Sequence, residues 1–215
     1  MRVVALSDTH GFHHDLKIPD GDLLIHAGDF SMKATVDDVI EFSQWFNALP
    51  HKHKIIVAGN HDQYCEDDPL FCDVEFRPAI YLNHESCEVM GYKIFGSPYS
   101  SSIYEPSPWS FDYPRNGPLS QYLWAQIPDH LDVLITHGPP KGILDLVNDP
   151  HVDEDLHVGD MNLLNEVMNK LPRVHIVGHI HEGAGHYDGV VTRFYNVCIC
   201  DVRYNPTNPV TLIDI

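Results

Sequence analysis

The chain has 215 residues, 43% of them hydrophobic and 20% charged, which fits one folded domain over residues 1–215 and gives no sign of disorder. Lys and Arg number 13 against 31 Asp and Glu, a formal charge of -18. This balance argues against sequence-independent binding to duplex nucleic acid, which depends on Lys and Arg at the phosphates. A small phosphate ester remains possible as a ligand, because bound metal ions would reverse the local field.

The sequence predicts a protein of the reducing cytoplasm that has no membrane partner. No apolar run approaches the ~20 residues that span a bilayer, and no charged segment followed by an apolar one indicates a secretory signal. The cysteines are odd in number and their spacing fits no disulfide framework, so we expect ordinary thiols at Cys65, Cys72, Cys87, Cys198 and Cys200.

The first part of the chain predicts a strand, a helix and a strand in a βαβ arrangement. Short apolar runs at residues 2–6, 22–26 and 54–58 are typical of buried strands. Between the last two, Thr35 is a candidate N-cap for a helix that runs at helical spacing up to Pro50.

The second part continues the alternation of strands and helices. It predicts strands at residues 92–96, 132–136 and 173–177, helices at 119–127 and 161–171, and β-structure from Val190 onward. Residues 97–118 carry five prolines and five aromatic residues, which indicates a long apolar loop. Periodicity alone therefore supports an α/β fold with parallel strands.

One pattern recurs where the predicted strands end. An apolar run stops, and a small residue with Asp, Asn or His follows at once. Because ligands of α/β sheets bind at the carboxyl ends of the strands, these side chains should meet in one place. The positions are Asp8 and His10, Asp29, Asn60 and His61, His137, and His179 and His181.

This set of side chains suits a site with two metal ions. Two divalent ions about 3.5–4 Å apart can hold a phosphoryl group and generate a hydroxide nucleophile. Imidazole and carboxylate ligands together favour Mn²⁺, Fe, Zn²⁺ or Ni²⁺ over Ca²⁺. The sequence therefore predicts two divalent transition-metal ions per chain, with Mn²⁺ as the first choice.

The same segments resemble the motifs of the calcineurin-like metallophosphoesterases, in the order that the family has them. They are Asp8-Thr9-His10, Gly28-Asp29, Gly59-Asn60-His61-Asp62, Thr136-His137-Gly138 and Gly178-His179-Ile180-His181. The resemblance implies a metallophosphoesterase-type αββα sandwich, in which helices flank two mixed β-sheets. It also implies ligand sets: Asp8, His10 and His181 for the first metal, Asn60, His137 and His179 for the second, and Asp29 as the bridge.

The resemblance further implies roles for two residues beside the metals. His61 would face the substrate, as a proton donor to the leaving oxygen or as a partner of the phosphoryl oxygens, and Asn60 would lie beside it. Asp62 would orient the His61 ring, as carboxylates commonly do for catalytic imidazoles.

The predicted substrate is a small or cyclic phosphodiester, hydrolysed by attack of a metal-bound hydroxide. Further segments, among them Gly138-Pro139-Pro140 and His181-Glu182-Gly183, resemble the metallophosphoesterase-domain (MPPED) proteins related to class III cyclic-nucleotide phosphodiesterases. Family members often place an Arg near the substrate phosphate after the Gly-Asp segment, but this chain has Lys33 there, a point charge rather than a planar fork. A monoester dianion gains most from such a clamp, so its absence favours a diester.

The aromatic loop from Tyr99 to Tyr113 has two interpretations: a surface loop packed on its own aromatic residues, or a wall that stacks a base over the metals. We favour the wall, with Trp109, Phe111 and Arg115 as substrate-binding residues. His13 and His14 are expected to be solvated.

Three other functions stay open at this point. A phosphomonoesterase and a nucleotide pyrophosphohydrolase would share the fold and the metals. A non-catalytic, metal-binding scaffold for protein interactions is the alternative of another class, and the presence of every ligand together with His61 argues against it. The sequence does not define the oligomeric state.

Overall fold

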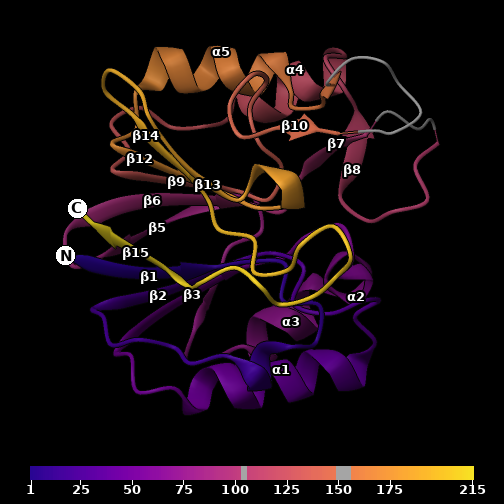
Figure 1. The fold of residues 1–215 in the computed structure, drawn as a ribbon, viewed down its shortest axis with the longest axis vertical. Helices are drawn as coiled ribbons and strands as arrows, with labels where there is room; N and C mark the ends of the chain where they lie inside the picture. The colour runs from indigo at the N-terminus through magenta and orange to yellow at the C-terminus, as the bar shows by residue number, and fades with distance from the viewer. Residues whose placement is uncertain (103–105, 149–155) are drawn as a thin grey trace.

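Two β-sheets lie face to face between two layers of helices in the computed structural model, which describes residues 1–102, 106–148 and 156–215 (Figure 1). The first sheet has the strand order β15-β1-β2-β3-β4, with β15 antiparallel and the rest parallel. Its strands are β1 (Arg2–Leu6), β2 (Leu23–Ala27), β3 (His53–Val57), β4 (Ile80–Tyr81) and β15 (Thr211–Asp214).

The second sheet has the order β13-β14-β12-β9-β6-β5, and its two outer strands are antiparallel. Its strands are β5 (Glu85–Val89), β6 (Tyr92–Ser97), β9 (Val133–Thr136), β12 (Val174–Val177), β13 (Gly185–Asp188) and β14 (Arg193–Asn196). Two short ladders extend from its helix-covered side: β7 (Ser100–Ser102) with β8 (Asp112–Pro114), and β10 (Leu146–Val147) with β11 (Leu156–His157).

Helices cover the outer face of each sheet. On the first sheet lie α1 (Val36–Ala48), α2 (Gln63–Asp67) and α3 (Pro69–Glu75), and on the second lie α4 (Pro118–Trp124) and α5 (Met161–Lys170) (Figure 1). Two 3₁₀ helices, η1 (His13–Asp15) and η2 (His181–Gly183), follow the strands that carry the predicted ligands. None of the helices in the described ranges is long and apolar enough to cross a membrane.

Alternation along the strands explains why the sheets stack. Successive strand residues point to opposite faces, so Val3 and Ala5 of β1 pack into the core between the sheets, while Val4 and Leu6 face the helices. The strands are apolar on both faces because both faces are covered. The predicted αββα sandwich with two mixed sheets is confirmed.

The strands and helices expected from the sequence lie within one or two residues of their predicted positions, except that α4 ends at Trp124, three residues before the predicted end. The Thr35 cap is confirmed: its side chain accepts the amide of Asp38, and the Asp38 side chain accepts the amide of Thr35. The sequence analysis missed α2, α3, β5 and several short strands, namely β4, β7, β8, β10, β11 and β13. The helices α2 and α3 are short, and β5 alternates polar and half-buried residues, so none of these three elements shows a clear hydrophobic period.

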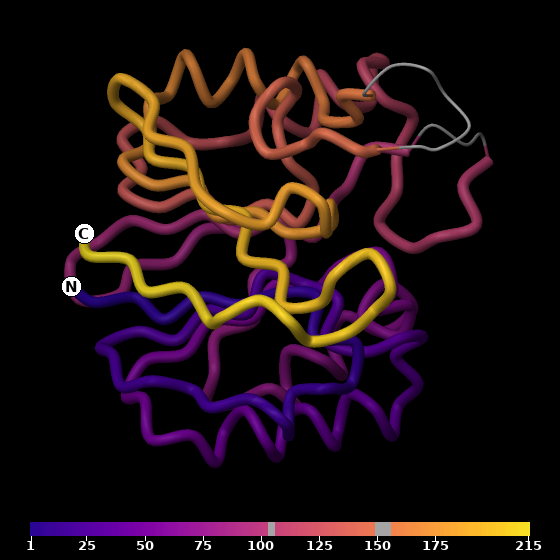
Figure 2. The backbone as a smooth tube through the Cα atoms, in the orientation of Figure 1, coloured from indigo at the N-terminus to yellow at the C-terminus, as the bar shows by residue number. Residues whose placement is uncertain are grey.

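The C-terminal segment returns to the first strand. β15 pairs with β1 in antiparallel register, so residues 211–214 lie beside residues 2–5 (Figure 2). This pairing carries the preceding turn, residues 201–208, to the edge at which β1 ends, and that turn contributes to the site described below.

Two buried histidines support the ends of ligand-bearing strands from neighbouring strands. His26 of β2 contacts the hydroxyl of Thr9 at 3.0 Å, and His175 of β12 contacts the hydroxyl of Thr136 at 2.8 Å. Both rings are fully buried, and burial lowers the pKa of each to about 3. Each ring is therefore neutral in the folded protein at neutral pH.

The depressed pKa of His175 predicts a loss of stability in acid. The unfolded chain takes up a proton below its ordinary pKa of 6.5 while the folded protein does not, so stability falls as the pH drops from 6.5 toward 3. Between pH 7 and pH 5 this amounts to about 2 kcal/mol for one histidine. His175→Gln keeps a polar partner for Thr136 without a titrating ring, so its unfolding free energy by urea denaturation should lose about 2 kcal/mol less over this range. His186→Gln, at an exposed position, is the control, and an equal loss in both variants would contradict the assignment.

Candidate metal centre

The predicted ligands meet where the carboxyl ends of the two sheets come together. Asp8 and His10 follow β1, Asp29 follows β2, Asn60 follows β3, His137 follows β9, and His179 and His181 follow β12. Four of these seven residues have a left-handed backbone, with φ of 52° at Asp8, 44° at His10, 57° at Asp29 and 67° at His179. Residues other than glycine rarely adopt this backbone conformation, and it is most frequent at functional sites. At each of these four residues the left-handed backbone turns the chain sharply away from the preceding strand.

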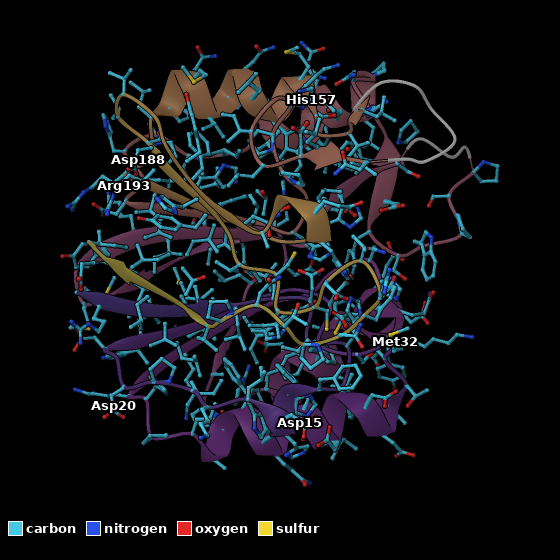
Figure 3. The ribbon with its side chains drawn as sticks, viewed as in Figure 1. Asp15, Asp20, Met32, His157, Asp188 and Arg193 are labelled. Carbon is cyan, nitrogen blue, oxygen red and sulfur yellow. The ribbon has the colours of Figure 1, made fainter. Side chains whose placement is uncertain are left out.

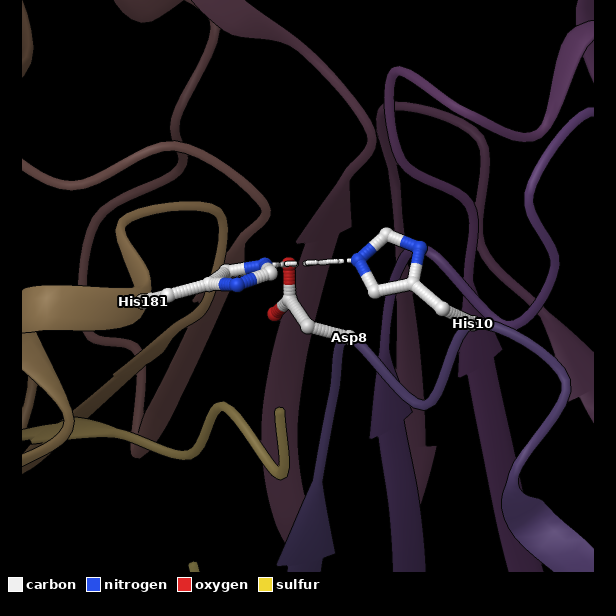
Figure 4. A group of neighbouring side chains, drawn as sticks. All are labelled: Asp8, His10 and His181. Carbon is white, nitrogen blue, oxygen red and sulfur yellow. Dashed lines mark hydrogen bonds and ion pairs between the residues drawn. The ribbon is translucent and has the colours of Figure 1, made fainter. Parts of the chain in front are cut away.

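The first group consists of Asp8, His10 and His181 (Figure 4). The Nε2 atoms of His10 and His181 lie 3.3 Å apart, and Asp8 Oδ1 lies 3.4 Å from His181 Nε2 and 4.0 Å from His10 Nε2. Figure 4 shows both rings pointing toward the Asp8 carboxylate from opposite sides.

The second group consists of His137, His179 and Asn60, with Asp29 beside both groups. Asn60 Oδ1 lies 3.0 Å from His137 Nε2 and 2.8 Å from His179 Nδ1. Asp29 Oδ2 lies 3.3 Å from His137 Nε2 and 4.0 Å from His10 Nε2, so one carboxylate oxygen faces both groups. The structure brings the predicted ligands together, and their division between two metal ions stays a prediction.

The ring orientations in the first group leave two lone pairs facing each other. His10 Nδ1 lies 3.2 Å from the carbonyl of Ser31, and His181 Nδ1 lies 2.8 Å from the carbonyl of Asp201. A carbonyl only accepts, so each Nδ1 carries the proton, and a neutral ring then has none on Nε2. Two bare nitrogens 3.3 Å apart repel unless a cation lies between or beside them.

The second group has the same property. His137 Nδ1 donates to the carbonyl of Ala27 at 3.0 Å, which leaves its Nε2 lone pair facing the oxygens of Asn60 and Asp29. Backbone carbonyls that fix the tautomer and direct the other nitrogen inward are the usual outer support of metal-binding histidines. Imidazole, carboxylate and amide donors of this kind fit divalent transition-metal ions at both groups.

The pKa values of the ligand histidines depend on burial and on the neighbouring carboxylates. Burial opposes a charge on His137, but the carboxylates of Asp29 and Asp8 raise its pKa to about 10. Burial likewise opposes a charge on His181, and its contact with Asp8 raises the pKa. Burial and the charge of His137 lower the pKa of His179 to about 4. Metal and protons therefore compete for the same nitrogens.

The Asp8 carboxylate also accepts hydrogen bonds from three donors other than the imidazole rings. Its Oδ2 accepts from the Ser7 hydroxyl, from the Cys198 thiol at 3.0 Å, and from the backbone amide of His179 at 3.0 Å. Burial and the charge of Asp8 raise the pKa of Cys198, so the thiol keeps its proton. A Cβ at Gly178 would overlap the Asp8 carboxylate, which explains the glycine before His179. Cys198, expected only as an ordinary thiol, thus supports a ligand.

His61 lies beside the ligands, but Asp62 does not orient it. His61 Nδ1 donates to the carbonyl of Met32 at 3.0 Å, and the ring lies 4.9 Å from the His10 ring. Asp62 instead accepts the backbone amides of Asp29 and Gly59, both at 2.8 Å. The predicted role of Asp62 is therefore corrected: its carboxylate organises the loops that carry Asp29 and His61. The adjacent position in the sequence suggested a side-chain pair, whereas the tight turn points the two side chains in different directions.

A pocket of about 390 Å³ opens over the metal ligands. Trp109 forms part of its wall, 4.4 Å from the His61 ring, as predicted for the aromatic loop. Phe111 is corrected: it is 3% exposed and packs in the core with Tyr99. Arg115 is corrected as well, because it lies outside the pocket lining and donates to the carbonyl of His157 at 3.3 Å.

Tyr204 is a pocket residue that the sequence analysis missed. Its ring lies 4.7 Å from that of His10 and 5.2 Å from that of His181, and it faces the pocket from the C-terminal turn. No hydrophobic period marks it, because Tyr204 lies in a turn outside the regular strands and helices.

Comparison with known proteins assigns this chain to a family. The sequence model described as calcineurin-like phosphoesterase matches residues 1–183. The chain belongs to this family. Calcineurin-like phosphoesterases are divalent-metal-dependent hydrolases of phosphate esters, which agrees with the ligand groups at the ends of the strands.

Curated relatives of this calcineurin-like phosphoesterase align along its whole length. Metallophosphoesterase domain-containing protein 1 of Homo sapiens is 37% identical over 238 residues, covering 100% of this chain and 71% of that protein. UPF0046 protein C25E10.12 of Caenorhabditis elegans is 35% identical over 233 residues, covering 100% of this chain and 81% of that protein. The crystal structure of TT1561 of Thermus thermophilus has a TM-score of 0.61 at 12% identity, over 91% of this chain and 88% of that one, and shares the fold.

Loss of the Cys198 thiol should weaken metal binding at the first group. Cys198→Ala removes a donor that fixes Asp8, and outer partners of metal ligands typically contribute 10–100-fold to affinity. We expect isothermal titration with Mn²⁺ to show affinity about tenfold lower or more. Cys200→Ala is the matched control, because its thiol lies near the carbonyl of Thr9 at 3.9 Å and does not contact Asp8. Equal affinities for the two variants would disprove the role.

Proposed function

We propose that this phosphoesterase hydrolyses small phosphodiesters, cyclic nucleotides among them, with two divalent transition-metal ions, Mn²⁺ as the first candidate. Asp8, His10 and His181 would hold one ion, Asn60, His137 and His179 the other, and Asp29 both. When bound, such ions polarise the phosphoryl oxygens and supply the nucleophile at neutral pH. A cytoplasmic location remains a prediction.

The charge of the pocket is the observation that carries the preference for a diester. No Lys or Arg is among the described residues that line it, and Asp112 adds a carboxylate to the wall. Lys33, the point charge considered from the sequence, is exposed and lies outside the lining. A monoester dianion would bring one more negative charge into this pocket than a diester does. The side chains beyond the metals therefore favour the substrate of lower charge.

Asp112 also offers an acceptor to the rest of the substrate. Its two oxygens accept from the hydroxyls of Ser100 and Ser107, both at 2.6 Å, which fixes the carboxylate in the wall. Each carboxylate oxygen has a further lone pair, so the group can still accept from a sugar hydroxyl or a base amine. Trp109 and Tyr204 provide aromatic surface for the base of a nucleotide.

His61 is placed to assist the leaving group. Because Nδ1 donates to Met32, Nε2 is the ring atom available to the pocket. In its protonated form the ring donates that proton to the leaving oxygen as the bond to phosphorus breaks, and the alcohol departs neutral. In its neutral form Nε2 has no proton to give. The tight packing of the ring against His10 and Trp109 holds it in this position.

One prediction from the proposed function concerns the substrate. With Mn²⁺, the chain should hydrolyse bis-p-nitrophenyl phosphate and 2′,3′- or 3′,5′-cyclic nucleotides faster than p-nitrophenyl phosphate, and chelation should abolish turnover.

Asp112→Asn should raise kcat/KM for the monoester relative to the diester about tenfold, since repulsion of one extra charge across such a pocket costs on the order of 1 kcal/mol. Asp129→Asn removes an exposed carboxylate far from the pocket lining and serves as control. Faster monoester turnover by the unmodified chain, or cleavage of a nucleotide pyrophosphate bond alone, would replace the diester by one of the alternative substrates.

The second prediction concerns His61 and the basicity of the leaving group. A proton donor matters most when the departing oxygen is basic, so His61→Ala should lower kcat about 10²-fold or more for a diester with an alkyl leaving group. The loss should be smaller for bis-p-nitrophenyl phosphate, whose leaving group departs as a stable anion. An equal loss for both substrates would indicate binding of the phosphoryl oxygens instead, and an active variant with no loss would remove His61 from the mechanism.

A further inference from the structure

A second cluster of metal-ligating side chains lies on the outer face of the first sheet, away from the pocket. His13 and His14 come from η1, and Glu41 comes from α1. Asp15, the last residue of η1, lies over α1 in Figure 3. None of the three residues lines the pocket described above.

Both imidazoles direct the same ring atom at one carboxylate. His13 Nε2 lies 3.0 Å from Glu41 Oε2 and 3.2 Å from Oε1, and His14 Nε2 contacts Glu41 Oε1. The candidate ligand atoms all lie within 4.8 Å of one another. Zinc binds nitrogen at about 2.0–2.1 Å and carboxylate oxygen at about 2.0–2.2 Å, so ligands of one ion are typically separated by roughly 3–3.5 Å. The cluster is therefore close to the spacing that a shared ion would require.

One ligand of this cluster is fixed by the core. The sequence analysis expected both histidines in solvent, but the His13 side chain is only 3% exposed. Its ring packs against Trp45 at 4.7 Å and edge-on against Phe42 at 5.4 Å. His14 and Glu41 are 62% and 49% exposed, which leaves an open side for water ligands and for entry of an ion. A fixed ring with two adjustable partners lowers the cost of ordering the site.

We propose that His13, His14 and Glu41 form a third metal site, which binds Zn²⁺ or a similar ion such as Ni²⁺ or Cu²⁺. Two histidines and one glutamate with room for water are a set that holds zinc in proteins, and two imidazoles favour these ions over Mg²⁺ and Ca²⁺. The ion would join η1 to α1. Because η1 follows the turn that carries Asp8 and His10, the site would also stabilise that turn.

The alternative is an ion pair between the histidines and Glu41 that binds no metal. Burial lowers the pKa of His13 despite the adjacent carboxylate, so this ring is a weak cation at neutral pH. A neutral imidazole is the form that binds metal. The two interpretations differ in whether the cluster takes up an ion, which can be measured directly.

The test counts zinc on the full chain, with and without the cluster. After saturation with Zn²⁺ and desalting, elemental analysis should find one more equivalent in the unmodified chain than in Glu41→Gln or His14→Ala. Both substitutions are at exposed positions, so folding should be preserved, and circular dichroism checks this. His186→Ala, at an exposed histidine outside the cluster, is the matched control and should retain the full count.

Trp45 gives a second, independent readout. Cu²⁺ quenches nearby indole fluorescence, and Trp45 lies within 4.7 Å of His13 and 6.4 Å of His14. In a Trp109→Phe background, which removes the indole beside His61, Cu²⁺ should quench Trp45 saturably. Glu41→Gln should shift the midpoint at least about tenfold, since loss of even an outer partner typically costs 10–100-fold. Equal zinc counts and an unchanged midpoint would overturn the site. Neither measurement depends on phosphodiester turnover.

Discussion

The mutual repulsion of the inward-facing lone pairs is the constraint on which the metal centre depends. Backbone carbonyls fix the Nδ1 protons of His10, His137 and His181, so the Nε2 lone pairs of the neutral rings converge on carboxylate and amide oxygens. The fold has to hold these groups together at a cost in electrostatic energy until a cation offsets it. The apolar strands on both sides provide that support, because they are covered on both faces.

Much of the site could be predicted from the sequence because the strand ends carry a local signal. An apolar run followed at once by Gly and Asp or His identifies both the strand and its polar end, and the topology of parallel strands brings those ends together. The ligand sets themselves followed from the family resemblance, while the pattern predicted only that these segments end at strand ends, which here belong to two facing sheets. For the same reason β1, β9 and β12 lie where the pattern placed them.

The sequence-based predictions were wrong where a turn, rather than the regular period of a strand or helix, sets the direction of a side chain. Phe111 and Trp109 are two residues apart in one irregular loop, yet only Trp109 reaches the pocket, because the backbone at Phe111 is left-handed, with φ of 54°. Asp62 and His61 are adjacent but diverge in a tight turn. Tyr204 and Cys198 come from distant segments: Cys198 lies beside Ser7 in an isolated parallel bridge, and Tyr204 lies in the turn before the β15 strand that pairs with β1. No local pattern specifies such a long-range contact.

The return of the C-terminal segment to β1 has a consequence for the order in which the protein is made. Asp8 leaves the ribosome early, but its partners His181 and Cys198 lie 173 and 190 residues later in the chain. The groups around the Asp8 carboxylate stay incomplete until these segments have been made. Asp8 therefore acquires these contacts only after residue 198 has been made, and a chain truncated before His181 would lack two of the groups that surround the Asp8 carboxylate.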